Sequence, residues 1–304
     1  MATPIILDCD PGHDDAIAIM LALASPEVEL LAVTAVAGNA PLHHTQANAI
    51  RVLDHLGRRD IPVAAGADRP LVQEPAPARD VHGSTGLDGP DLPPPSRDPV
   101  ETHAIDLIAE LVTTQEQPVT LVVTGPMTNA ALFIARHPEA ATALDRIVFM
   151  GGAIGLGNVT PAAEFNVWAD PEAARRICTS GLDVTMVGLD VTHQALFTPD
   201  DTEAIRGRGV AGRLTAELVE FYARSHPHRP GTPIHDAVAV AQVIDPTLLT
   251  LEHCHVEIDC GPVSRGRTLV DRLHVTGNEP NVHVATGIDP GFTEWLAERI
   301  TSLG

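Results

Sequence analysis

Residues 6–19, ILDCDPGHDDAIAI, place four aspartates within eight positions, between two apolar runs. The run before them predicts a buried strand, and the run after them predicts a helix whose first turn carries Asp14 and Asp15. Crowded carboxylates raise one another's pKa and destabilise a fold unless positive charge lies among them. The nearest arginine in the sequence is Arg51, and lysine is absent, so a bound cation is the simplest source of that charge.

The turn inside this stretch favours a metal site with oxygen ligands. Asp10 and Asp15 flank the turn, in which Pro11 fixes φ and Gly12 is conformationally free, so both carboxylates can point to one place. Ca²⁺ accepts irregular all-oxygen coordination; Mg²⁺ is an alternative, and Zn²⁺ is disfavoured because no Cys/His set is present. Helix capping is the competing interpretation. Capping explains one aspartate such as Asp14, but not four, so we favour the metal site.

Alternating apolar strands and helical periods predict an α/β fold with a mostly parallel central sheet and helices on both faces. The expected strands are 4–10, 29–39, 61–66, 145–152 and 183–190, with a strand, turn and helix over 119–138. Further helices are expected over 14–25, 44–57, 101–114 and 170–180. The last third is predicted to be helix-rich, with late strands at 254–260, 266–273 and 281–287 before a C-terminal helix.

Two segments show neither the periodicity of a strand nor that of a helix. Residues 73–98 and 225–233 are rich in Pro and Gly and are expected to be irregular, either as lids over a site or as plain surface loops. His82 lies in the first segment and by itself would be interpreted as a surface histidine. No clear linker separates parts of the chain, so we expect one domain over residues 1–304.

Composition excludes several classes of function. The chain has 304 residues, of which 44% are hydrophobic, and a formal net charge of −21 without a basic stripe, which argues against a nucleic-acid partner. The absence of lysine excludes Schiff-base chemistry and a P-loop. No apolar stretch reaches the roughly 20 residues that cross a bilayer, so no membrane partner is expected. Four scattered cysteines and the lack of a basic leader predict a cytoplasmic protein with reduced thiols.

Polar residues follow several of the predicted strands. Asp10, Asn39, Thr124 and Gly151 each come at the carboxyl end of a strand. In parallel sheets, ligand sites form beyond these ends, so we expect the four positions to share one crevice.

Two further polar clusters stand at predicted helix starts or turns. His235 and Asp236 open an apolar helix, either as an exposed helix start or as a proton donor and a further metal ligand. Asn158, Glu164 and Asn166 follow a Gly-rich turn that matches the dinucleotide fingerprint poorly. Such amide and carboxylate groups suit a hydroxyl-rich ligand such as a sugar.

These motifs together resemble one known family. The segment DCDPGHDDAIAI is similar to the N-terminal signature of the nucleoside hydrolases, the inosine-uridine preferring N-ribohydrolases. The further matches, in the family's order and approximate spacing, are AVAGN (35–39), HGSTGLDGP (82–90), VVTGPMTNAAL (122–132), residues 148–174 and PIHDAVAV (233–240). The resemblance implies a Rossmann-like nucleoside hydrolase fold. It also implies hydrolysis of ribonucleosides of the inosine, uridine and cytidine type to ribose and free base, in nucleoside salvage, by a homodimer or homotetramer.

The resemblance also implies a role for each matching residue. One Ca²⁺ per chain would be held by Asp10, Asp15, the main-chain carbonyl of Thr124, and Asp236. Asp14 would be the general base toward water. The ribose would be bound by Asn39, Asn158, Glu164 and Asn166, with Met150 nearby. His82 and His235 would lie at the nucleobase, with His235 able to protonate the departing base.

Some alternatives stay open. A haloacid-dehalogenase-like phosphohydrolase would have Thr or Val where Gly12 stands and is a poor match. A non-catalytic metal-dependent nucleoside or sugar binder has the same motifs. Some pyrimidine-preferring relatives carry an aromatic residue at the position of Pro227, here flanked by Tyr222 and His228, so the base preference is not predicted. The presence of His235 argues against the purine-specific subgroup.

Overall fold

A nine-stranded sheet forms the centre of the computed structural model, which describes residues 2–225 and 228–304. Its first six strands are β1 (Thr3–Cys9), β2 (Val28–Ala35), β3 (Val63–Ala65), β4 (Thr120–Val123), β5 (Arg146–Met150) and β6 (Val184–Val187). They are all parallel and lie in the order β3-β2-β1-β4-β5-β6. This order is that of a doubly wound fold and confirms the predicted mostly parallel sheet.

Three late strands complete the sheet beyond β6. They are β9 (Leu249–Ile258), β10 (Thr268–Asp271) and β11 (Val282–Ile288). Strand β11 pairs parallel to β6, whereas β9 pairs antiparallel to both β11 and β10. Strand β9 begins at Leu249, before the expected start at residue 254, because residues 249–254 pair along the whole length of β11.

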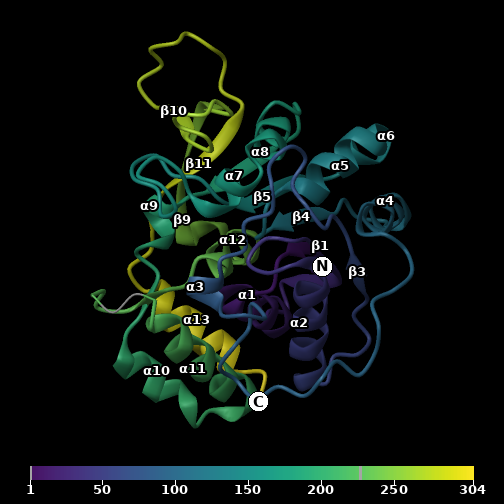
Figure 1. Ribbon diagram of the computed structural model, residues 1–304, viewed down its shortest axis with the longest axis vertical. Helices are drawn as coiled ribbons and strands as arrows, with labels where there is room; N and C mark the ends of the chain where they lie inside the picture. The colour runs from purple at the N-terminus through teal and green to yellow at the C-terminus, as the bar shows by residue number, and fades with distance from the viewer. Residues whose placement is uncertain (1, 226–227) are drawn as a thin grey trace.

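Helices cover both faces of the sheet (Figure 1). One layer contains α1 (His13–Ala24), α2 (Leu42–His55), α11 (Gly209–Ala223), α12 (Asp236–Ile244) and α13 (Phe292–Thr301). The other contains α4 (Ala104–Thr114), α5 (Thr128–Arg136) and α8 (Pro171–Cys178). Shorter helices connect these elements: α3 (Arg79–His82), α6 (Pro138–Ala141), α7 (Phe165–Ala169), α9 (Leu189–Thr192), α10 (Pro199–Arg206) and the 3-10 turn Pro246–Leu248.

Strand β1 shows why the sheet is covered on both faces. Ile5 and Leu7 pack into the core of the first helix layer, whereas Ile6 packs into that of the second, and all three are fully buried. Successive strand side chains point to opposite faces, so a continuous apolar run requires a layer on each side. The sheet therefore directs the end of β1 into the interior, where Asp10 begins the site.

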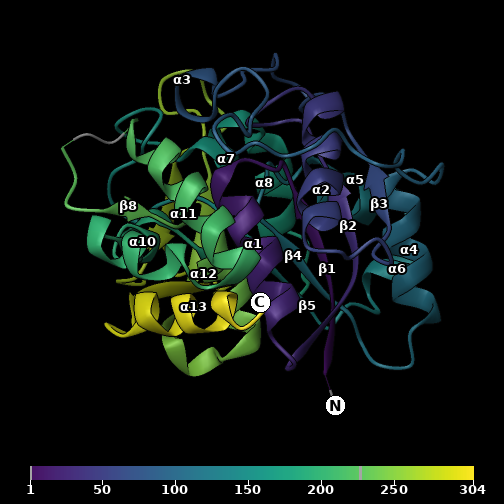
Figure 2. The same cartoon turned by 90° about the horizontal axis from the view of Figure 1, so that it is seen from below.

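The two segments that were predicted to be irregular each contain a short regular element. Residues 73–98 contain the short helix α3, which Figure 2 places at the edge of the molecule opposite the N-terminus. Within 225–233, residues 226 and 227 lie outside the described part of the chain. Strand β8 (Thr232–Pro233) pairs antiparallel with β7 (Leu196–Phe197) in a small second sheet that the sequence did not predict.

Among the described residues, no helix is long and apolar enough to cross a membrane. The four cysteines are free thiols, and three of them are buried.

Candidate active site

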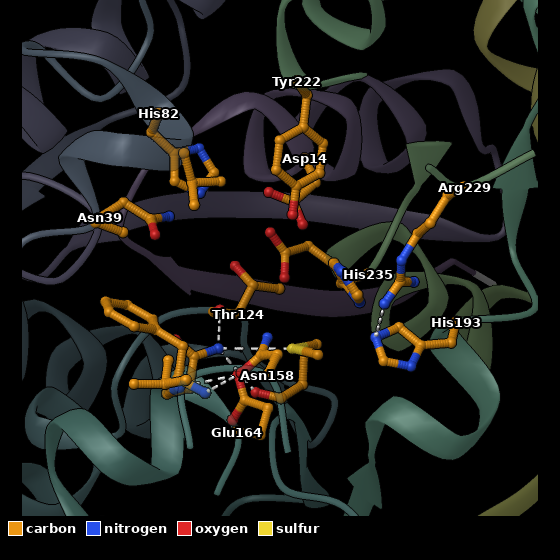
Figure 3. Close-up of a pocket in the computed structure, with 17 residues that line it drawn as sticks. Asp14, Asn39, His82, Thr124, Asn158, Glu164, His193, Tyr222, Arg229 and His235 are labelled. Carbon is orange, nitrogen blue, oxygen red and sulfur yellow. Dashed lines mark hydrogen bonds between the residues drawn. The ribbon is translucent and has the colours of Figure 1, made fainter. Parts of the chain in front are cut away.

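A cavity opens where the sheet changes its winding direction, at the carboxyl ends of β1 and β4 (Figure 3). Its empty volume is about 730 Å³, a figure that includes open solvent at the mouth. Of the predicted site residues, Asp14, Asn39, His82, Thr124, Met150, Asn158, Glu164, Asn166, His235 and Asp236 line it. The predicted ligands Asp10 and Asp15 are buried next to this lining. The structure thus brings the twelve predicted catalytic, binding and metal residues together, whereas Gly151, which was also expected at this crevice, is not part of the lining.

The carboxylates of Asp14, Asp15 and Asp236 form an acidic cluster, with one oxygen of each within 4.8 Å of the others. Helices α1 and α12 pack against each other and bring residues from distant parts of the chain to one point. Asp15 accepts hydrogen bonds from the Gly12 backbone N–H at 2.9 Å and from the Thr124 hydroxyl at 2.8 Å. These bonds fix the position of the Asp15 carboxylate, so this member of the cluster is oriented before any ligand binds.

Asp10 adds a fourth buried carboxylate beside this cluster. Its Oδ2 accepts the Asn39 backbone N–H at 2.6 Å, but its Oδ1 is buried with no hydrogen-bond partner among the described residues. Gly38 allows this close packing, since a Cβ there would stand 2.0 Å from Oδ2. A buried carboxylate oxygen without a partner is costly unless a cation or another donor binds it. This oxygen fits the role of a metal ligand.

The first aspartate of the stretch has a different environment. Asp8 points away from the cluster and accepts hydrogen bonds from the Thr34 hydroxyl at 2.6 Å and the Asn129 amide at 2.8 Å. Burial still raises its pKa to about 7. Asp8 is therefore a buried structural carboxyl, and Asp10, Asp14 and Asp15 form the part of the stretch that faces the site.

The electrostatics of the acidic cluster call for a cation. Burial and the charge of Asp15 raise the pKa of Asp14 to about 7. Burial and the charges of Asp14 and Asp15 likewise raise the pKa of Asp236 well above its ordinary value. The Thr124 carbonyl accepts from the Asn166 amide at 2.7 Å and retains a second lone pair. The donor set is all oxygen, which fits Ca²⁺ or Mg²⁺ and not Zn²⁺.

Three asparagines present defined polar atoms to the cavity. The Asn166 amide nitrogen donates to the carbonyls of Thr124 and Met150 at 2.7 and 3.0 Å, which turns its Oδ1 into the acceptor for a ligand. The Asn39 amide nitrogen donates to the Asp10 carbonyl at 3.3 Å, so Asn39 also offers its Oδ1 as an acceptor. Asn158 has the opposite orientation. Its Oδ1 accepts the Phe165 backbone N–H at 3.0 Å, so its amide nitrogen is the donor that a ligand can use. Two acceptors and one donor suit a ligand with several hydroxyl groups.

Glu164 is fixed at the start of helix α7. Its carboxylate accepts the backbone N–H groups of Gly152 at 2.9 Å, Asn166 at 2.8 Å and Val167 at 3.2 Å. Burial outweighs these bonds and raises the pKa of Glu164 to about 7. The carboxyl is therefore held rigidly at the cavity wall by the helix start that it caps.

The two predicted histidines are both buried, at 5% and 6% exposure for His82 and His235. His235 Nδ1 lies 2.8 Å from the Thr192 hydroxyl on α9, so its other ring nitrogen, Nε2, is the edge turned away from that contact. His82 is therefore not the surface residue that its isolated position in the sequence indicated.

His82 is oriented by His13, which the sequence did not single out. His13 Nε2 lies 2.8 Å from the Asp88 carbonyl, which only accepts, so Nε2 carries the proton. Burial lowers the pKa of His13 to about 4, and its Nδ1 lies 3.0 Å from His82 Nδ1. The His13 backbone N–H also points to the same His82 nitrogen at 3.4 Å. His13 therefore holds the Nδ1 edge of the His82 ring, and Nε2 is the edge turned away from it.

Several lining residues were missed by the sequence analysis. His193 lies just beyond α9, and the strand-end rule applied to β6 would have indicated this region. Tyr222, the only tyrosine of the chain, stacks on His82 with ring centroids 5.3 Å apart. Arg229 lines the cavity and has no local motif around it. The position of Pro227, which bears on base preference, lies outside the described residues.

Comparisons with known proteins agree with this geometry. The sequence model of the family described as inosine-uridine preferring nucleoside hydrolase matches residues 5–293. A pyrimidine-specific ribonucleoside hydrolase RihA from Citrobacter koseri is 48% identical, over 99% of this chain and 98% of the relative. The solved purine-preferring ribonucleoside hydrolase from Gardnerella vaginalis is 35% identical with a TM-score of 0.92, covering 99% of both chains. The plant nucleoside hydrolase PpNRh1 is 34% identical, also with a TM-score of 0.92 and 99% coverage of both chains.

The doubly wound fold with this site at its switch point, taken with these comparisons, places the chain among the hydrolases that act on N-glycosidic bonds of ribonucleosides. The chain belongs to the inosine-uridine preferring nucleoside hydrolase family and is a ribonucleoside hydrolase.

Proposed function

We propose that the protein catalyses the Ca²⁺-dependent hydrolysis of the N-glycosidic bond of ribonucleosides, releasing ribose and free base in nucleoside salvage. Pyrimidine ribonucleosides are the preferred substrates in this proposal, supported by the 48% identity to a relative named for that specificity. The main support for the proposed hydrolysis is that the acidic cluster, the amide side chains and His235 line one cavity. We further propose that residues 1–304 form a single domain that assembles as a homodimer or homotetramer in the cytoplasm.

The cation would be held by Asp10, Asp15, Asp236 and the Thr124 carbonyl. When bound, it would supply a more acidic water and an anchor for two neighbouring ribose hydroxyls. The unpartnered Oδ1 of Asp10 and the raised pKa of Asp236 support this assignment. Mg²⁺ fits the same atoms, but Ca²⁺ better tolerates the irregular set of ligands from three elements.

Asp14 would take the proton from the attacking water. Its carboxylate lines the cavity and belongs to the acidic cluster. A carboxylate in this position accepts the proton while the water oxygen forms the new bond to C1′ of the ribose. Asp14 lines the cavity together with Asp236, whereas Asp15 is fully buried behind them.

The ribose would lie against the asparagines and Glu164. Cleavage of the glycosidic bond builds positive charge on the ribose ring, as in other glycosidases. The oxygens of Asn166, Asn39 and Glu164 are fixed by their hydrogen bonds before the reaction, so no reorganisation is needed when that charge develops. This preorganised negative surface stabilises the transition state more than the ground state.

His235 would protonate the departing base. The electron pair of the C1′–N bond stays on the base nitrogen, which accepts a proton from His235 Nε2. The Thr192 hydroxyl lies 2.8 Å from Nδ1 and holds that edge of the ring, so Nε2 is the nitrogen that would donate the proton from the imidazolium form. His82, which His13 holds through Nδ1, is the alternative donor.

Release of reducing sugar tests the proposal directly. Purified protein is incubated with uridine, cytidine and inosine, with Ca²⁺ or with EDTA, and ribose is measured. We expect ribose and free base in equal amounts with Ca²⁺, faster from uridine and cytidine, and loss of release in EDTA that Ca²⁺ restores. D10A should remove activity and the calcium content found by elemental analysis. A non-catalytic binder would bind the nucleosides and release no ribose, and full activity of metal-free protein would disprove the metal assignment.

A further inference from the structure

Arg229 is the only arginine among the described residues that line the cavity, and the chain has no lysine. It lies on the His235 side of the cavity, across from Asn39 (Figure 3). One of its terminal nitrogens is 3.3 Å from Nε2 of His193, whose ring meets that of His235 edge-on at 5.6 Å. A permanent positive charge thus stands next to the proposed proton donor.

Arg229 makes no ion pair with a carboxylate among the described residues. The acidic cluster lies deeper, at the end of the cavity where the ribose would bind. The cavity therefore has a negative end and one cationic group at its exposed mouth. That polarity matches a reaction in which the sugar gains positive charge and the base gains negative charge.

We propose that Arg229 binds the 2-oxo group of a departing pyrimidine, which makes it a specificity-determining residue; this proposal rests on the proposed hydrolysis. When the C1′–N1 bond breaks, its electron pair stays on N1 and delocalises onto O2. The guanidinium donates to O2 while His235 supplies the proton to N1, so the base leaves neutral. A purine lacks an exocyclic oxygen next to its leaving nitrogen N9, so the same contact is absent.

His193 acts as a positioning residue in this arrangement. A guanidinium only donates, so His193 Nε2 is the acceptor of the 3.3 Å contact. One N–H group of Arg229 is thereby committed to His193, and the planar guanidinium retains others for the base. Arg229 is exposed at the mouth, so its contact with O2 would be weaker than a fully buried one.

The test compares R229Q with a matched control. The control is R224Q, which removes the same charge. In the parent protein the Arg224 guanidinium packs over the Phe221 ring at 4.9 Å and does not line the cavity. Each variant is assayed for kcat/KM with uridine, 2-thiouridine, inosine and p-nitrophenyl riboside. R229Q should lose roughly tenfold or more with uridine, the scale for a hydrogen bond to a charged group. It should change less than threefold with inosine and the nitrophenyl riboside, and R224Q should resemble the parent.

The sulfur of 2-thiouridine is a poor acceptor, which isolates the contact. The preference for uridine over 2-thiouridine should be larger in the parent than in R229Q, while R229K should fall between them. H193A should lower kcat/KM for uridine by a smaller factor and spare the nitrophenyl riboside. Equal losses of R229Q on all substrates, or an unchanged uridine preference, would overturn the proposal. Absence of ribose release by the parent protein would instead disprove the proposed hydrolysis, so the two failures are distinguishable.

Discussion

Removal of the cation should make stability fall as the pH rises. In the cation-free protein, burial and neighbouring charge raise the pKa of Asp14 from 3.8 to about 7, and the pKa values of Asp10 and Asp236 are raised as well. A carboxyl with a folded-state pKa above its unfolded value binds a proton more tightly in the folded state. Its contribution to stability is complete below about pH 4 and is lost as the pH rises through about 7.

The size of the effect follows from Asp14 alone. The unfolded-state and folded-state pKa values of Asp14 are 3.8 and about 7. Raising the pH from 5 to 8 crosses about two of the three pH units between them, so the free energy of unfolding falls by about 3 kcal/mol. For a chain of 304 residues, this lowers Tm by about 5 °C. The other raised carboxyls of the cluster act in the same direction.

Thermal unfolding in EDTA and in millimolar Ca²⁺, each at pH 5 and pH 8, measures the effect. The increase of Tm by Ca²⁺ should be small at pH 5 and larger at pH 8, by about 5 °C. Asp8 titrates in both conditions, so the comparison with and without Ca²⁺ removes its contribution. D14N should flatten the pH dependence in EDTA, whereas the exposed control D200N should not. A Ca²⁺-induced shift that is the same at both pH values would refute the reasoning.

Three further outcomes concern catalysis. D14N keeps the shape of the side chain but removes the base, so kcat for uridine should fall by roughly 10²–10⁴ with a smaller change in KM; near-normal turnover would leave Asp14 as a helix cap only. H235A should slow uridine by about 10² while nearly sparing p-nitrophenyl riboside, whose leaving group needs no proton, and equal loss of kcat on both would remove His235 from the acid role. T192V deletes the hydroxyl that lies 2.8 Å from His235 and should cost roughly tenfold on uridine with little effect on the nitrophenyl riboside. T192S should restore the activity, and a T192V protein that acts normally on uridine would show that the hydroxyl does not orient the histidine.

The sequence by itself determined the frame of this protein. The continuous apolar run of β1 requires cover on both faces, and the alternation of strands and helices follows from periodicity, so the parallel sheet was predictable. The four aspartates around a Pro-Gly turn predicted a cation, because their mutual repulsion is a local property. The strand-end rule likewise placed Asn39 and Thr124 in one crevice, where the structure has them.

Only the tertiary structure decided which of these groups act together. Asp8 looks like its neighbours in sequence, but the alternation of β1 turns it to Thr34 and Asn129, away from the cluster. Helix packing brings Asp236 to Asp14, and no local pattern encodes that meeting.

The same holds for Arg229, His193 and Thr192, which come from segments without a motif. A residue type such as arginine or threonine is common on any surface, and its chemistry depends on what stands within about 3 Å of it. Distances of 2.8 Å from Thr192 to His235 and 3.3 Å from Arg229 to His193 arise only when α9, the chain after α11 and the start of α12 fold against one another. The sequence therefore determined which carboxylates, amides and histidines were candidates for the site, and tertiary packing determined which neighbours orient them.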